Sequence, residues 1–68
     1  MKKEIIQPQL NLRRVMLQRN VSDTWLAAQI NISRTAINLI INGHTSPSLR
    51  RLYQIADALN VHLFELFD

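Results

Sequence analysis

The chain has 68 residues, of which 47% are hydrophobic and 19% are charged, and its formal net charge is +3. This length allows one domain, because a chain of this size buries only roughly 60% of its unfolded surface and cannot supply two cores. The hydrophobic share argues against a disordered chain. The absence of cysteine excludes disulfides and thiolate metal sites. The excess of Lys and Arg favours a polyanionic partner.

The first residues, MKKEIIQPQ, contain two lysines but lack the long apolar run of a signal peptide. No stretch approaches the roughly 20 apolar residues that a membrane span needs. We therefore expect no membrane partner and a cytoplasmic location. Residues 1–7 are predicted to form a flexible N-terminal arm and residues 8–68 the folded domain. For Lys2 and Lys3, a frayed terminus is favoured over a basic arm that binds phosphate.

One glycine and two prolines leave few breaks in the chain, so we expect an all-α fold of five short helices. The first is predicted over residues 8–19, because Pro8 suits the first position of a helix. The second is predicted to begin after Ser22, whose side chain can cap it. It would end at Asn31, since Asn tolerates the left-handed conformation that a sharp helix exit needs.

The third helix is predicted to follow the second after a very short turn. It would run over residues 34–42, with Ser33 as its cap and Gly43 after its end. Ala27, opposite the bend, is small enough to let the two helices approach closely. This pattern is a helix-turn-helix, whose second helix can enter the major groove of DNA.

Two more apolar helices are predicted in the last third of the chain. The fourth starts near Pro47 or Ser48 and has an apolar face at helical spacing, formed by Leu49, Leu52, Ile55, Ala56 and Leu59. A short fifth helix over residues 62–67 is apolar almost all round. We expect Leu66 and Phe67 to be its first internal residues.

The run from Val21 to Phe67 resembles the phage-repressor-like (Cro/repressor) helix-turn-helix domain. The matching positions are Ser22, the pair Leu26-Ala27, the turn Ile32-Ser33, the inward Ile37 and Ile40, Asn42-Gly43, the segment PSLRRLYQIADALNV and the closing ELF. The resemblance implies a small transcription regulator that binds double-stranded DNA. We expect a repressor that acts as a homodimer on an inverted repeat.

The sequence departs from this family at a few positions. Asn31 replaces the usual Gly of the turn, which is physically tolerable. Asp23 stands where many members have a Gln that holds a phosphate; an acidic side chain suits a helix N-terminus but repels phosphate. Met16 and Ile41 replace a common Arg–Glu pair, and such a change to apolar packing is often neutral or stabilising.

The third helix carries the candidate base contacts on the side away from its isoleucines. The Arg34 guanidinium can bond guanine O6 and N7 in a fork, and the Asn38 amide can bond adenine N6 and N7. Thr35 can donate or accept, and the methyl groups of Leu39 can meet a thymine methyl. The alternatives are a solvated helix face or, for Leu39, a protein contact. The predicted base-contacting set is Ser33, Arg34, Thr35, Asn38 and Leu39.

Contacts to the DNA backbone are predicted from the segment that follows this helix. Arg50 and Arg51 lie in the first turn of the fourth helix, where a cation is mildly unfavourable unless a partner compensates. Phosphate would be such a partner, and an ordinary solvated pair of arginines is the alternative. The predicted phosphate-contacting set is Asn42, His44, Thr45, Arg50 and Arg51.

Two aromatic residues are candidates for protein contacts. Trp25 turns away from the inner face of its helix, so it either folds over a neighbouring helix or forms a protein-binding surface. Phe64 exceeds what one small core needs, which makes it a candidate for a symmetric dimer contact. An alternative function is therefore an antitoxin or accessory regulator that mainly binds a partner protein.

No enzyme chemistry is expected. Ser22, Ser33 and Ser48 each precede a helix directly, so they read as caps and not as nucleophiles. His44 and His62 lack acidic neighbours with metal-ligand spacing, and no Gly-rich phosphate loop is present. We expect no cofactor, no metal and no catalytic residue.

Overall fold

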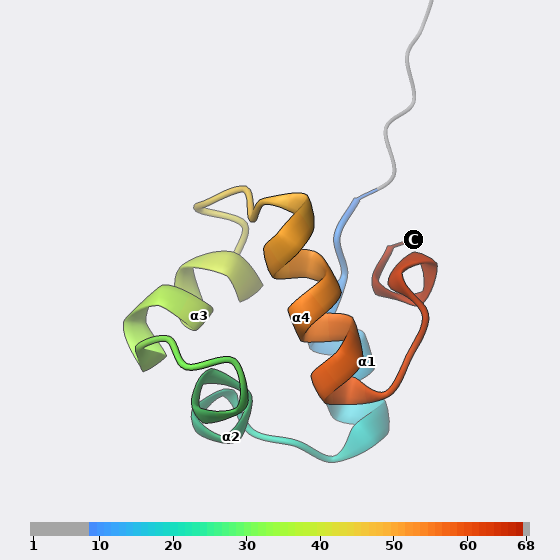
Figure 1. Cartoon of the computed structure of the whole chain (residues 1–68), viewed down its shortest axis with the longest axis horizontal. Coiled ribbons are helices and arrows are strands. Elements are labelled where there is room, and N and C mark those ends of the chain that lie inside the picture. Colours follow the sequence, from blue (N-terminus) through green and yellow to red (C-terminus); the bar gives the residue numbers. More distant parts are fainter. Residues whose placement is uncertain (1–8, 68) are drawn as a thin grey trace, which may run out of the picture.

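A computed structural model of the chain describes residues 9–67. The elements are α1 (Leu12–Arg19), α2 (Asp23–Gln29), α3 (Arg34–Ile41), α4 (Leu49–Leu59) and a 3-10 turn, η1 (Leu63–Leu66). Figure 1 shows α4 in the middle, with α2 and α3 on one side and η1 on the other. The all-α class is confirmed, but the five predicted helices are four α-helices and one 3-10 turn in the described part.

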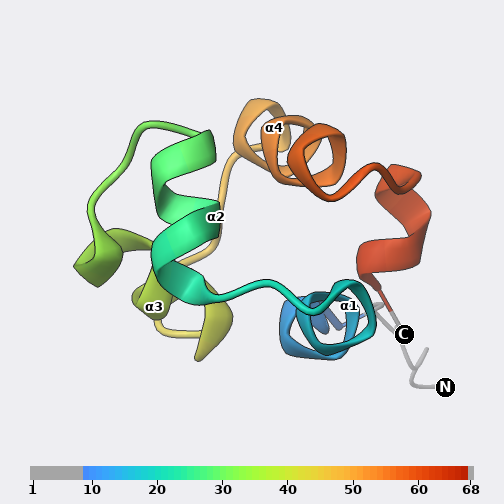
Figure 2. The same ribbon diagram turned by 90° about the horizontal axis from the view of Figure 1, so that it is seen from below.

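The core consists of aliphatic side chains and one methionine, and every element contributes to it. In Figure 2, α1 and α4 face each other and η1 closes one end of the space between them. Within residues 9–67 no polar or charged residue is buried. The core residues are Leu12, Val15, Met16, Leu26, Ala27, Ile30, Ile37, Ile40, Ile55, Ala56, Leu59 and Leu66.

A side-chain oxygen caps the N-terminus of each of the four α-helices. The Ser22 hydroxyl accepts the Trp25 N–H at 3.0 Å, and the Ser33 hydroxyl accepts the Ala36 N–H at the same distance. Asn11 and Ser48 do the same for α1 and α4. These bonds satisfy donors that have no partner inside a helix, and each is worth about 1 kcal/mol. The predicted caps at Ser22 and Ser33 are confirmed.

Asparagines in the left-handed conformation follow three of the four α-helices. Their φ angles are 57° at Asn20, 58° at Asn31 and 57° at Asn60. The predicted bend at Asn31 is therefore confirmed. It is closed by a hydrogen bond of 3.0 Å from the Ile32 N–H to the Ala27 carbonyl. Ala27, which supplies this carbonyl from within α2, is buried in the core.

The predicted start of the first helix is wrong. Gln9 and Leu10 are not helical, and α1 begins at Leu12, after the Asn11 cap. The preceding backbone pairs instead with the end of the chain: Leu10 forms an antiparallel bridge with Phe67, and the Asn11 N–H donates to the Leu66 carbonyl at 2.7 Å. Pro8 and the predicted arm, with Lys2 and Lys3, lie outside the described residues.

The last predicted helix is shorter and tighter than expected. It is the 3-10 turn η1, at whose start the His62 N–H donates to a Glu65 carboxylate oxygen at 2.6 Å. An α-helix does not continue because Phe67 leaves the turn in an extended conformation to pair with Leu10. Leu66 is fully buried and Phe67 partly buried, while the Phe64 side chain is 85% exposed.

Candidate nucleic-acid interface

Helix α3 separates its apolar side from its polar side. Ile37 and Ile40 are buried, and Ile41 is half-buried at the helix end. Ser33, Arg34 and Thr35, at the leading end, are all exposed. In a helix, residues that differ by three or four positions share a face, so burying the isoleucines turns the polar edge outward. The predicted inward residues Ile37 and Ile40 are confirmed.

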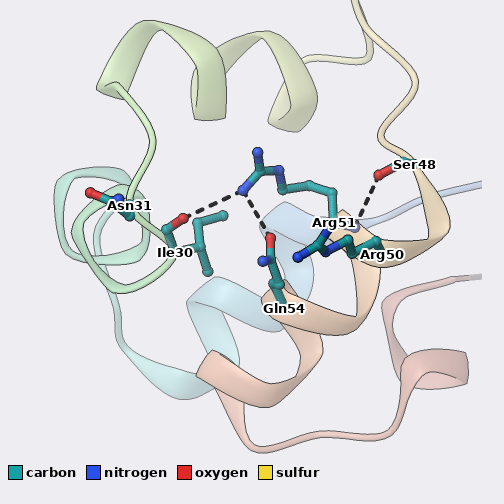
Figure 3. A pocket seen from close by; sticks show the side chains of 6 residues that line it. All are labelled: Ile30, Asn31, Ser48, Arg50, Arg51 and Gln54. Atoms are coloured by element: carbon teal, nitrogen blue, oxygen red, sulfur yellow. Dashed lines mark hydrogen bonds between the residues drawn. The ribbon is translucent and has the colours of Figure 1, made fainter.

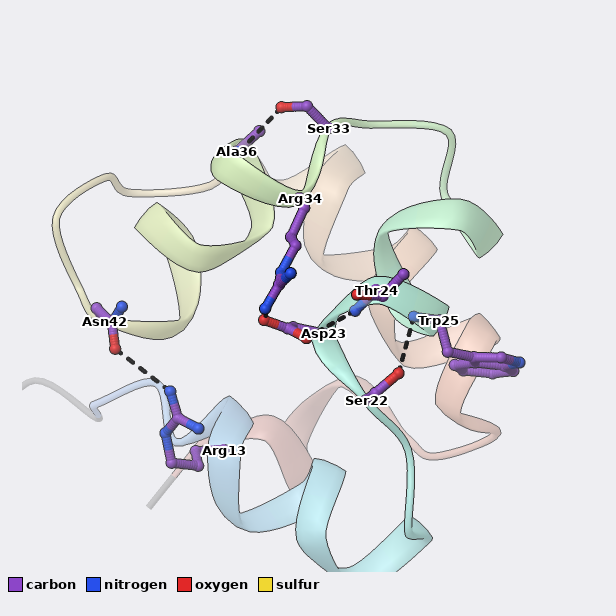
Figure 4. Close-up of polar contacts among 9 residues, drawn as sticks. All are labelled: Arg13, Ser22, Asp23, Thr24, Trp25, Ser33, Arg34, Ala36 and Asn42. Carbon is purple, nitrogen blue, oxygen red and sulfur yellow. Dashed lines mark hydrogen bonds and ion pairs between the residues drawn. The ribbon is translucent and has the colours of Figure 1, made fainter.

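Arg34, the first residue of α3, forms an ion pair with α2. Its Nε atom lies 3.4 Å from Oδ2 of Asp23, the first residue of α2. Figure 4 shows the guanidinium extended from α3 toward the N-terminus of α2. The Arg34 side chain is nevertheless 69% exposed, so most of it faces solvent. Arg34, the predicted contact to guanine, is thus accessible to solvent, and the ion pair holds its side chain only at the Nε atom.

Asp23 has a pKa below its ordinary value. The main cause is the Thr24 backbone N–H, which donates to Oδ1 at 2.8 Å and stabilises the ionised form. Partial burial of the carboxylate raises the pKa and so opposes this effect. The positive charge of Arg34 lowers the pKa further, as do side-chain hydrogen bonds from Arg34 and Asn38. Asp23 is therefore a carboxylate at neutral pH, and the two main candidate base readers both lie beside it.

The other candidate base contacts differ in how free they are. Thr35 is exposed, and Asn38 is half-buried one turn further along α3. Leu39 is 39% exposed. The Ser33 oxygen already accepts the Ala36 N–H, so the hydroxyl can offer only its own proton and its remaining lone pair to a base.

Arg13 of α1 joins this edge, although no sequence pattern singles it out. Its Nη2 donates to Oδ1 of Asn42, at the end of α3, at 3.3 Å (Figure 4). Both residues are exposed. The contact spans 29 residues of sequence and depends on how α1 packs beside α3. It places a cation next to Asn42, one of the predicted phosphate contacts.

The turn after α3 exposes His44 and Thr45, but their backbone amides are occupied. The His44 N–H donates to the Leu39 carbonyl at 2.8 Å, and the Thr45 N–H reaches the same oxygen at 3.3 Å. Gly43 makes this tight turn possible with a φ of 77°. Only the side chains of His44 and Thr45 are therefore available to a phosphate.

The two adjacent arginines of α4 have different surroundings. Arg50 is exposed. Arg51 is half-buried, and its Nη1 donates to the Gln54 side chain at 2.9 Å and to the Ile30 carbonyl, at the end of α2, at 3.4 Å. Figure 3 shows this guanidinium crossing a shallow notch between α2 and α4. Arg51 thus has protein partners that compensate its unfavourable position at the helix start.

The two candidate protein contacts are both at the surface. Trp25 is 39% exposed and points away from Arg34 and Asp23 (Figure 4). Phe64 lies on η1, on the opposite side of the molecule from α3 (Figure 1). Within the described residues, no group of three or more metal-ligating side chains is present, and no helix is long and apolar enough to cross a membrane.

This geometry can be compared with known proteins. Residues 12–66 match the helix-turn-helix family. The chain belongs to this family. The match covers all four α-helices and η1, so the resemblance to the Cro/repressor type that the sequence indicated is confirmed.

Two solved structures are similar over most of the chain. One is a presumed DNA-binding protein from Bacteroides fragilis, with a TM-score of 0.84 and 26% identity over 91% of this chain and 100% of the other. Another is a transcriptional regulator from Listeria innocua, with a TM-score of 0.78 and 23% identity over 91% of this chain. The chain spans only 60% of that regulator. No match was found among curated protein sequences.

Proposed function

We propose that the protein is a transcriptional regulator that binds a specific sequence in double-stranded DNA and represses by occupying it. The observation that carries the proposal is the polar edge of α3, which residues 9–67 leave exposed at Ser33, Arg34 and Thr35 while Ile37 and Ile40 are buried beneath it. Family membership supports DNA binding by a regulator. We infer a cytoplasmic location, because the two similar structures come from bacteria, Bacteroides fragilis and Listeria innocua, whose DNA lies in the cytoplasm.

In this proposal the residues have two kinds of role. Arg34 and Asn38 supply direct base readout, each worth about 1–3 kcal/mol against a wrong base, with Ser33, Thr35 and Leu39 beside them. Contacts to the DNA backbone come from the exposed side chains of Asn42, His44, Thr45 and Arg50. Arg13 joins them because it lies beside Asn42. Arg51 contributes less, because its guanidinium already bonds groups within the protein. These contacts supply affinity that falls with salt.

The test compares two arginines. Sequences are first selected from random duplex DNA at two salt concentrations, and affinities are then measured for the selected site and for single-base changes in it. Arg34→Ala should flatten the preference at one base position. Arg50→Ala should weaken binding to all sequences alike and reduce the salt dependence. If wild-type protein selects no sequence, or if Arg34→Ala leaves every preference unchanged, the proposal is wrong.

We propose further that the protein binds as a homodimer on an inverted repeat. One recognition helix of eight residues reaches few bases, whereas two helices about 34 Å apart read two half-sites. The 85% exposed Phe64 favours η1 as the contact between copies. Sedimentation equilibrium should show a dimer that Phe64→Ser dissociates. The selected sequences should contain one half-site twice, in opposite orientation.

A second candidate function rests on Trp25. A large aromatic side chain that is 39% exposed on α2, away from the α3 edge, favours a protein partner, as in an antitoxin or accessory regulator. Under this alternative, Trp25→Ala should release a stoichiometric partner in pull-downs from the native cell. Under the first proposal, the same variant should bind the selected DNA site as wild type does.

A further inference from the structure

The ion pair between Asp23 and Arg34 joins the starts of the two helices of the helix-turn-helix motif. Asp23 Oδ2 and Arg34 Nε are 3.4 Å apart, and the residues are 11 positions apart in sequence. Asp23 is the first residue of α2, and Arg34 is the first residue of α3. Both lie at the candidate interface. Figure 4 shows that the carboxylate lies on the same side of the motif as the guanidinium.

The atom that Asp23 occupies leaves the rest of the guanidinium available. Arginine has five N–H donors, of which Nε carries one and the two terminal Nη atoms carry four. Within the described residues, no hydrogen bond engages the Nη atoms of Arg34, while Nε points at Asp23. The Nη pair can therefore still bond guanine O6 and N7 as a fork. Asp23 orients the side chain without using its reading atoms.

Without this contact, Arg34 would have a competing target. Its side chain is 69% exposed, and within residues 9–67 no other side chain or backbone group holds it. Along a DNA groove, phosphates attract a free cation on a long flexible stem regardless of sequence. An arginine that can swing to a phosphate exchanges a base-specific contact for a non-specific one. A fixed carboxylate beside Nε opposes that exchange.

The same carboxylate is unfavourable for DNA binding in general. Asp23 is ionised at neutral pH and its side chain is 26% exposed. A negative charge at the interface repels phosphates of any sequence. Its removal should therefore have opposite effects on two quantities, namely affinity for arbitrary DNA and discrimination between sites.

We propose that Asp23 is a positioning residue that determines specificity: it holds Arg34 toward the base edges and away from the phosphates, at a cost in overall affinity. This inference rests on the proposed function, since it requires that Arg34 reads a base. Under this inference, Asp23 contributes to the selectivity between DNA sequences. A side chain that contacted a phosphate from this position would contribute to the overall affinity instead.

The experiment uses Asp23→Asn, which removes the charge and keeps an oxygen that can accept the Thr24 N–H. Dissociation constants are measured for the selected site, for the site with the base read by Arg34 changed, and for an unrelated duplex. Asp23→Asn should bind the unrelated duplex more tightly than wild type. It should lower the discrimination at the Arg34 position by about fivefold or more, the scale of a lost bidentate contact.

Four further variants make the result specific. Asp57→Asn is the matched control, because it removes the same charge from an exposed position on α4. It should leave the discrimination unchanged. Asp23→Glu keeps a carboxylate and should retain part of the discrimination. Adding Asp23→Asn to Arg34→Ala should cause no further loss at that base position. Asp23→Gln provides a second neutral side chain if Asp23→Asn does not fold.

The possible failures are distinguishable. If wild-type protein shows no sequence preference, the proposed function fails and this inference fails with it. If Arg34→Ala relaxes the preference but neither Asp23→Asn nor Asp23→Gln does, only the positioning role of Asp23 is wrong. If both neutral variants lower discrimination at every base position alike, Asp23 acts on the fold of the motif and not on Arg34.

Discussion

Arg50 and Arg51 are neighbours of the same type, yet only Arg51 connects two helices. Its guanidinium bonds the Ile30 carbonyl at the end of α2 and the side chain of Gln54. We expect Arg51→Ala to lower the free energy of unfolding by about 1–2 kcal/mol, because a half-buried carbonyl loses a charged donor. Arg50→Ala should change it by less than about 0.5 kcal/mol. Urea denaturation of both variants checks this difference, and equal effects would contradict it.

The lowered pKa of Asp23 predicts a pH dependence of stability. Because the folded value lies below the ordinary value, roughly 4 for Asp, the stabilisation is fully present above about pH 4. It is lost as the pH falls through the lower, folded value. The free energy of unfolding should therefore fall more steeply in wild type than in Asp23→Asn as the pH is lowered below about 4. Parallel pH profiles would mean that the Asp23 carboxylate does not stabilise the fold.

Single residues were predictable where the signal is local. Ser22 and Ser33 cap helices because a short hydroxyl side chain can reach an N–H three residues ahead, and Asn31 bends the chain because of its own backbone preference. The pair Asp23–Arg34 was not predictable in this way. It depends on the angle between α2 and α3, and so on tertiary packing that no short stretch of sequence specifies.

At the scale of elements, the turn between α2 and α3 determines how α3 is oriented on α2. Asn31 has a φ of 58°, a conformation that costs most residues roughly 1–2 kcal/mol and glycine nothing. We expect Asn31→Ala to lower the melting temperature and Asn31→Gly to leave it nearly unchanged. Thermal unfolding followed by circular dichroism measures both. A greater loss with Gly than with Ala would mean that the Asn31 side chain itself stabilises the turn.

The elements that the sequence predicted least well are the first and the last. Both errors have one cause, since Leu10 and Phe67 pair with each other across the whole sequence. Pro8 favoured a helix that starts at residue 8. The segment from Gln9 to Asn11 instead pairs with Leu66 and Phe67 near the end of the chain. The middle helices were placed within one or two residues because their caps and apolar spacing are local signals.

For the molecule as a whole, the small core makes each buried side chain important. A chain of 68 residues has a total stability of about 3–10 kcal/mol. Leu66 is 0% exposed in η1, between α1 and α4, so Leu66→Ala should cost about 2–5 kcal/mol, a large share of that total. Phe64→Ala, two residues earlier at an 85% exposed site, is the control and should leave the monomer folded. Comparable losses from the two variants, measured in dilute monomer, would contradict the burial of Leu66.

The bridge between Leu10 and Phe67 also decides how the domain can be joined to other molecules. It brings both ends of the described chain to one place, and there Gln9 and Leu10 also line a pocket with Ile40, Gly43 and Thr45 at the end of α3. A fluorophore, a purification tag or a second protein module attached at Gln9 would therefore start beside Thr45, one of the proposed phosphate contacts. A module attached after η1 would start on the side of the molecule away from α3 (Figure 1), so this fusion should leave the proposed DNA contacts uncovered.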